Sequence, residues 1–109
     1  EKKFRIDQIQ LATRNAIEIP FKIMRVCFDS LSLIHEMAKK GNPNSITDVG
    51  VAMFCIKAAI NGAFLNVRIN CNDLKDKDFI KETLSKANEI LKITDLKEKE
   101  ILKIVDDKL

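Results

Sequence analysis

The stretch "SITDVGVAMFCIKAAINGAFLNVRIN", residues 45–70, decides the fold of this chain, because nearly every position in it is apolar or small. It contains no proline and no sustained alternation of polar and apolar residues, so we expect one long helix rather than a strand. A helix that is apolar all round must be surrounded by other elements. The stretch therefore predicts an all-α fold in which the central helix 45–70 is buried.

Three further helices are expected around it, which makes a multihelical bundle of about four helices. A first helix covers about residues 2–18, and Pro20 predicts a break or kink before a second helix over about residues 21–40. Gly41 is expected to end that second helix in a left-handed conformation. A long C-terminal helix covers about residues 76–107, with an apolar stripe that Glu98 interrupts.

The central helix needs more cover than this chain supplies. Three other helices from 109 residues can hardly enclose it, and the C-terminal helix is longer than a compact four-helix domain needs. Some of the covering surface must therefore come from missing sequence or from another subunit.

The composition argues against several classes of protein, namely nucleic-acid-binding, membrane-spanning, disulfide-bonded and zinc-binding proteins. The net charge is +3, the basic residues are interleaved with acids, and Trp and Tyr are absent, which argues against nucleic-acid binding. Lys57 interrupts the longest apolar stretch, so we expect no membrane span. The three cysteines, Cys27, Cys55 and Cys71, have long spacings and fit no disulfide framework or zinc site. We expect small buried thiols and a cytoplasmic protein.

The polar residues of the central helix are the candidates for function. Ser45 is placed to cap the helix, with Asp48 three residues later as in a capping box. At 100° per residue Asp48 and Asn66 share a face, and a second stripe lies nearly opposite, made of Gly50, Lys57, Asn61 and Arg68. The stripes are either structural, as caps and ion pairs, or they line a cleft for a polar ligand. Spacing leaves both interpretations open.

No metal or nucleophile site is visible. His35 is the only histidine, and no second His or Cys stands at ligand spacing, so we expect it to pack or to lie at the surface. The chain also lacks a glycine-rich phosphate loop and a Ser/His/Asp set.

Two sequence boxes resemble the cyclodeaminase/cyclohydrolase family of folate enzymes. They are "KKGNPNSITDVGVA" (39–52) and "AAINGAFLNVRIN" (58–70), and the preceding "ATRNAIEIPFKIM" (12–24) also fits. The resemblance covers essentially the whole chain, yet the Pro-Gly-Gly-Gly-Ser segment with which family members begin is absent. It therefore implies that residues 1–109 are a single helical unit, the C-terminal half of a domain that assembles as a dimer.

The resemblance also implies a chemistry. Such enzymes either cyclise 5-formiminotetrahydrofolate with loss of ammonia or hydrolyse 5,10-methenyltetrahydrofolate. Both reactions need proton donors and acceptors but no metal or redox cofactor. Asp48 is the expected acid/base or pterin-binding residue. The expected contacts to the tetrahydrofolate derivative are Asn42, Asn44, Asn66, Arg68 and Asn70, with Arg68 pairing with an anionic glutamate tail. The chain lacks the half in which the family carries part of the pocket, so it is expected to be inactive alone. A catalytically silent helical dimerisation or assembly module is the alternative.

Overall fold

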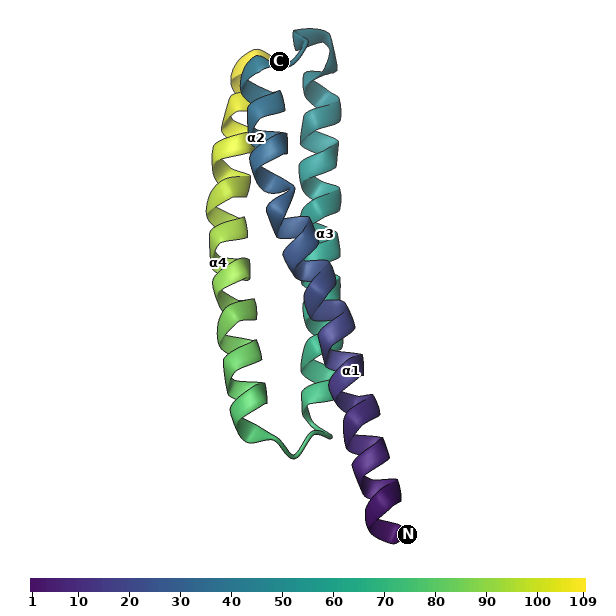
Figure 1. Ribbon diagram of the computed structural model, residues 1–109. Helices are drawn as coiled ribbons and strands as arrows, with labels where there is room; N and C mark the ends of the chain where they lie inside the picture. The colour runs from purple at the N-terminus through teal and green to yellow at the C-terminus, as the bar shows by residue number, and fades with distance from the viewer.

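The computed structural model describes residues 1–109 and contains helices only. Its elements are α1 (Lys2–Asp29), α2 (Leu31–Lys40), the 3-10 turn η1 (Pro43–Ser45), α3 (Ile46–Cys71) and α4 (Lys77–Lys108). In Figure 1, α1 and α2 form one bent rod beside α3, and α4 runs along the bundle to bring the C-terminus next to α2. The molecule is 63 Å long and 19 by 16 Å across. The all-α multihelical prediction is confirmed.

The break between the first two helices lies at Ser30, not at Pro20. Helix α1 continues through Pro20 to Asp29, so the prediction of a break at the proline is wrong. At Ser30 the backbone N–H bonds to Cys27 O at 3.1 Å, three residues back, and the hydroxyl donates to Val26 O at 3.0 Å. The helix is tightened and redirected there, and α2 starts with the next residue.

A side chain from α3 compensates for the proline inside α1. Pro20 has no N–H, so the Ala16 carbonyl loses its helical partner. The Asn70 side-chain amide donates to Ala16 O at 3.3 Å and to Asn66 O at 2.8 Å. Asn70 thus satisfies the carbonyl that Pro20 leaves free, and this contact ties α1 to the C-terminal part of α3.

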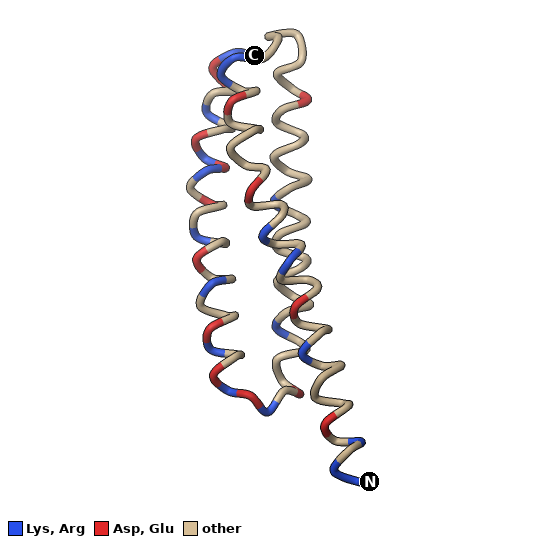
Figure 2. The backbone as a smooth tube through the Cα atoms, viewed as in Figure 1, with Lys and Arg blue, Asp and Glu red and all other residues tan.

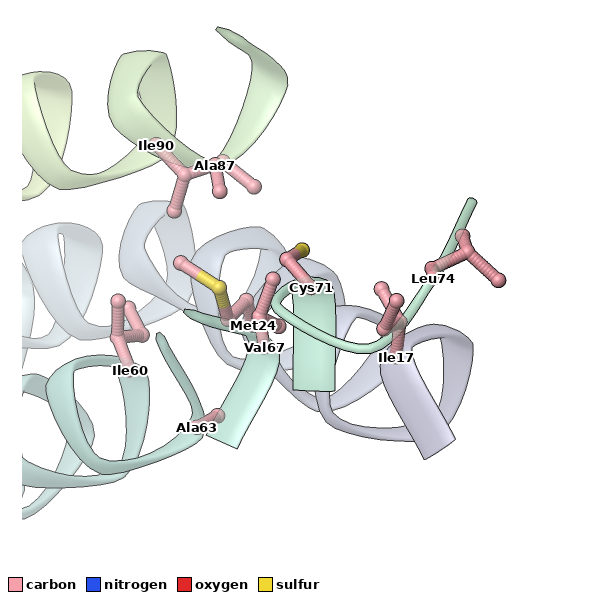
Figure 3. Close-up of a cluster of buried hydrophobic side chains, with 9 residues drawn as sticks. All are labelled: Ile17, Met24, Ile60, Ala63, Val67, Cys71, Leu74, Ala87 and Ile90. Atoms are coloured by element: carbon pink, nitrogen blue, oxygen red, sulfur yellow. The ribbon is translucent and has the colours of Figure 1, made fainter. Parts of the chain in front are cut away.

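Two apolar clusters form the core. The first joins α1, α3 and α4, and Figure 3 shows its members, which are Ile17, Met24, Ile60, Ala63, Val67, Cys71, Leu74, Ala87 and Ile90. The second joins α2, α3 and α4 around Met53 and Ile101, both fully buried. Phe28 and Ile56 pack against both clusters, so the core is continuous across the Ser30 break.

Helix α3 is buried along one side only. Met53, Ile60 and Val67 are fully buried, whereas Leu65 and Ile69 are 62% and 61% exposed. The expectation of a buried central helix therefore holds for the side that faces α1 and α4 and fails for the other side. The cysteines divide in the same way, because Cys71 is buried and Cys55 is exposed, contrary to expectation. Burial raises the pKa of the Cys71 thiol.

The two polar interruptions noted in the sequence meet in space. Lys57 Nζ donates to Glu98 Oε1 at 2.6 Å and lies 3.5 Å from Asp95 Oδ1. The hydrogen bond to the Glu98 carboxylate raises the pKa of Lys57. Charged residues occur along the whole length of α4, whereas the only charged residues of α3 are Asp48, Lys57 and Arg68 (Figure 2). The outer side of α4 is therefore a water-facing surface, and Lys57 makes the charged contacts between α3 and α4, to Glu98 and Asp95.

Both ends of the bundle are fastened by long polar side chains. Gln10 donates to Asp73 O at 3.1 Å and accepts from Lys75 N at 2.8 Å, so one amide holds the α3–α4 turn against α1. Lys108 Nζ donates to the Ala38 and Lys39 carbonyls at 2.6 and 2.7 Å, which fastens the end of α4 to the end of α2. Residues 2–9 of α1 extend beyond the turn and are all exposed.

One segment is long and apolar enough to cross a membrane by length and composition. It is Pro43–Cys71, whose most apolar 18-residue window has a mean hydropathy of 1.5, and 28% of that window is buried within this chain. The expectation that this protein has no membrane partner stays a prediction.

The Pro20–Asn70 contact can be measured by a double-mutant cycle. We expect Asn70→Ala to lower the free energy of unfolding by about 1–3 kcal/mol, because it leaves a half-buried carbonyl unpaired. In a Pro20→Ala background the restored N–H takes that carbonyl, and the loss shrinks. Urea unfolding gives both values. The matched control is Asn61→Ala, whose amide bonds only to a carbonyl of its own helix, Lys57 O at 2.9 Å. Equal losses from Asn70→Ala in both backgrounds would contradict this account.

Candidate functional site

A pocket lies where α2 ends and α3 begins. Its volume is about 300 Å³, the lower end of the range for small-molecule sites. The lining residues are Ile34 and Met37 of α2, Gly41, Asn42 and Ser45 of the connection, and Asp48, Val49 and Ala52 of α3. Two of the six predicted site residues, Asn42 and Asp48, are therefore brought together here.

The connection is shaped by its turn residues. Asn42 caps η1, because its Oδ1 accepts a hydrogen bond from Asn44 N at 3.0 Å, and Pro43 occupies the first position of the turn. Gly41 has φ −72° and ψ 173°, which is extended, so the expected left-handed conformation is wrong. A Cβ at Gly41 would lie 2.5 Å from the Met37 carbonyl oxygen. Glycine is thus required by close approach, and this approach forms one wall of the pocket.

The start of α3 has no side-chain cap. Ser45 occupies the N-cap position without a capping hydrogen bond, and Asp48 makes none either, so the predicted capping box is wrong. Asp48 lies in the first turn, where the positive end of the helix dipole favours a carboxylate. It is exposed and forms no ion pair. The Asp48 carboxylate is therefore available to a ligand.

The chemistry of the pocket follows from these groups. Ile34, Met37, Val49 and Ala52 supply apolar surface, and Asp48 supplies the only charge among the lining residues. Such a site suits a flat, partly apolar group that carries positive charge, because the walls contact its faces and the carboxylate stabilises the cation. No three His, Cys, Asp or Glu side chains lie close enough together to hold a metal ion.

The other predicted residues lie elsewhere. Asn44 is exposed in η1, outside the pocket. Asn66 is 18 residues beyond Asp48, about 27 Å along the helix, and its carbonyl accepts from Asn70. Asn70 is engaged with Ala16, as described above. Arg68 stacks over the Phe64 ring at 5.6 Å and lines a separate depression of about 290 Å³. Contacts from these residues to a folate stay predictions.

His35 is partly buried and lies outside the pocket. Its Nδ1 lies 4.0 Å from a Glu100 carboxylate oxygen, and its side chain is 20% exposed. It thus joins α2 to α4 near the core edge, as the sequence indicated.

Sequence reasoning missed Met37. It lies three residues after Ile34 and outside the apolar stripe that faces the core, and it is half-exposed. An apolar residue off the core stripe of an otherwise clean amphipathic helix was the available signal.

Comparison with known proteins adds an independent finding. The family model described as formiminotransferase-cyclodeaminase matches residues 1–89. The methenyltetrahydrofolate cyclohydrolase of Methylorubrum extorquens is 37% identical over 91 residues, 84% of this chain and 44% of that protein. The formimidoyltransferase-cyclodeaminase of Dictyostelium discoideum is 38% identical over 84 residues, 77% of this chain and 16% of that protein. The rat protein of the same name is 27% identical over 92 residues. The chain spans less than half the length of these relatives.

Gly41 offers a test of how the pocket wall is built. We expect Gly41→Ala to lower the free energy of unfolding by about 1–3 kcal/mol, because the Cβ meets backbone and the connection must shift. The matched control is Gly62→Ala, since a Cβ there meets nothing within 4 Å. That change should stabilise α3 by roughly 0.5–1 kcal/mol through helix propensity. Thermal and urea unfolding check that Gly41→Ala lowers the free energy of unfolding and that Gly62→Ala raises it. A Gly41→Ala variant as stable as the unmodified protein would contradict the proposed close approach.

Proposed function

Because this chain belongs to the formiminotransferase-cyclodeaminase family, we propose that it is one half of an enzyme that opens or closes the one-carbon bridge of a tetrahydrofolate derivative. Its relatives are named for folate one-carbon chemistry. The observation that carries the proposal for this chain is the pocket at the start of α3, with an unpaired carboxylate among apolar walls.

The proposed reaction matches the groups in the pocket. Hydrolysis of 5,10-methenyltetrahydrofolate and cyclisation of 5-formiminotetrahydrofolate both pass through a tetrahedral carbon between two nitrogens. The methenyl bridge is a flat amidinium cation, so Asp48 is placed to stabilise it and to transfer a proton as it is attacked or formed. The apolar side chains of Ile34, Met37 and Val49 would contact the ring faces. The reaction needs no metal or redox cofactor.

Asn42 is the second proposed contact. Its Oδ1 is used by Asn44 N, and its amide N–H groups have no partner in this chain. They can donate to a carbonyl of the substrate at the pocket edge. Arg68 is proposed only as a contact for an anionic glutamate tail, since it lies far along α3. The enzyme is proposed to be cytoplasmic, which the three free cysteines support.

Asp48→Asn tests the catalytic role. We expect turnover to fall by roughly 10²–10⁴-fold, because the amide can neither accept the proton nor stabilise the cation. The free energy of unfolding should change by less than about 1 kcal/mol, since the carboxylate makes no hydrogen bond and only the helix dipole is affected. The assay uses this chain co-expressed with the unmatched portion of the Methylorubrum extorquens relative. Loss of methenyltetrahydrofolate absorbance and release of ammonia from formiminotetrahydrofolate are measured in separate arms.

Asp78→Asn is the matched control, because Asp78 lies in the first turn of α4 and away from the pocket. It should leave turnover unchanged. Equal effects of the two substitutions on turnover per folded molecule would make Asp48 structural. An assembled protein with neither turnover nor folate binding would favour the silent assembly module.

We also propose that the complete enzyme is a homodimer. The apolar side chains at the exposed N-terminal end of α1 support this, because Phe4 is 65% and Ile9 61% exposed. Residues 2–9 are all exposed. A second copy would remove them from water.

Sedimentation velocity of the co-expressed protein tests the dimer. Phe4→Glu is expected to convert it to a form of half the mass, while Leu109→Glu, at the other end of the bundle, leaves it unchanged. Leu109 is also strongly exposed, at 76%. An assembled protein that sediments as one copy at micromolar concentration would overturn the proposed dimer.

A further inference from the structure

The end of α2 carries two backbone carbonyl groups that the helix itself does not pair. In a continuing helix the Lys39 carbonyl would accept from the N–H of the residue four positions later, but that residue is Pro43, which has none. The Ala38 carbonyl would accept from Asn42, but the chain is extended at Gly41 and no backbone N–H reaches that carbonyl. The last turn of α2 therefore needs donors from elsewhere in the chain.

Lys108, at the end of α4, supplies both hydrogen bonds. Its Nζ donates to Ala38 O at 2.6 Å and to Lys39 O at 2.7 Å. Figure 1 shows the C-terminal end of α4 beside the end of α2. The ammonium lies at the negative end of the α2 dipole, where a cation is stabilised, and it forms no ion pair with a carboxylate. Lys108 thus caps α2 from another helix.

The two lysines of α2 itself are occupied by a different partner. Lys39 and Lys40 both pair with Glu36, at 3.2 and 3.1 Å. Their hydrogen bonds, from Lys40 and then from Lys39, lower the pKa of the Glu36 carboxyl, so it stays charged. These pairs offset the two positive charges beside the end of the helix. The ammonium of Lys108 is therefore the one that reaches the free carbonyls.

Apolar packing brings Lys108 to this place. Val105, one helical turn before it, is buried in the second core cluster together with Ala38 and Ile34 of α2. A Cβ at Gly50 would lie 3.5 Å from Val105 Cγ1, so Val105 also packs closely against α3. The last turns of α4 are thus held between α2 and α3, within reach of the pocket wall.

The capped turn is also part of the candidate pocket. Met37 precedes the two capped carbonyls, Gly41 and Asn42 follow them, and all three line the pocket. Gly41 N bonds to Met37 O at 2.8 Å, so these residues and the capped turn form one backbone unit. Asp48 belongs to α3, to which Lys108 makes no hydrogen bond. Loss of the cap would therefore loosen the wall formed by the end of α2 and leave the carboxylate in place.

We propose that Lys108 is a positioning residue for the candidate pocket, because its cap on α2 holds Met37 and Asn42 where they contact the ligand. The proposal rests on the proposed function for the identity of that ligand, a tetrahydrofolate derivative. Lys108 lies outside the pocket lining and beyond residues 1–89, which the family model matches. The affinity of the pocket thus depends on the last turn of α4.

Amide hydrogen exchange of this chain tests the cap without a ligand. Lys108→Met keeps an unbranched side chain and removes the donors, whereas Lys108→Arg keeps donors. We expect the Gly41 amide to exchange at least about tenfold faster in Lys108→Met, because the turn that protects it opens more often. In Lys108→Arg the rate should return close to that of the unmodified chain. The Lys75 amide, bonded to Gln10 at the opposite end of the bundle, is the internal reference and should not change. Nuclear magnetic resonance resolves both amides.

Lys103→Met is the matched control for the loss of a positive charge from the end of α4. Lys103 is exposed, and its partner is Asp107 of the same helix, at 3.2 Å. It makes no contact with α2. The control should leave the Gly41 exchange rate unchanged.

Kinetics test the effect on the pocket, with this chain co-expressed with the unmatched portion of the Methylorubrum extorquens relative. We expect Lys108→Met to raise KM for 5,10-methenyltetrahydrofolate about five- to tenfold and to change kcat less than about twofold, because the wall contributes to binding while Asp48 carries the chemistry. Lys108→Arg should restore KM, and Lys103→Met should leave both constants unchanged. A role in stability alone would lower the amount of folded enzyme and hence the apparent kcat, with KM unchanged.

Three results would overturn the proposal. They are a Gly41 exchange rate that Lys108→Met leaves unchanged, an equal acceleration at Gly41 and Lys75, and a lower kcat with an unchanged KM. Because exchange is measured without folate, failure of the cap is separable from failure of the proposed function. Unmodified co-expressed protein without turnover would contradict the enzyme proposal alone.

Discussion

The packing of one side of α3 against α1 and α4 is the constraint on which the rest of this structure depends. Removing Met53, Ile60 and Val67 completely from water places the two core clusters on either side of the Ser30 break. Because α3 is apolar on its other side as well, this arrangement cannot satisfy the whole helix. One side of α3 is thus packed in the core and the other side is exposed. The candidate pocket lies where the exposed side meets the end of α2.

Polar residues in this core act by compensating for one another across helices. Pro20 removes an N–H from α1, and Asn70 supplies a replacement donor from α3. Lys57 would be an isolated charge in an apolar helix, and Glu98 would be an isolated charge in an apolar stripe, but they pair at 2.6 Å. Leaving either partner alone in a half-buried setting would cost more than the pair itself contributes. These contacts therefore specify which faces of the helices meet.

The region around Asp48 differs from those compensated sites. Its carboxylate has no partner, the helix that it opens has no side-chain cap, and the neighbouring side chains are apolar. Groups left unsatisfied at the edge of an uncovered apolar surface are available both to a ligand and to a covering polypeptide. This coincidence places the folate site proposed for the chain at the end of an apolar surface that these helices leave exposed.

Local sequence determined the helical class, the limits of α3 and α4 to within a residue or two, and the two boxes that indicate the family. These follow from periodicity and turn residues, which act over a few positions. Only the tertiary structure decided that α1 runs through Pro20, since the compensating donor is 54 residues away. It also decided that Asn42 and Asp48 share a pocket while Asn66, Arg68 and Asn70 do not, and that Asp48 makes no cap. Such outcomes depend on which helix faces meet, and spacing within one helix carries no information about its neighbours.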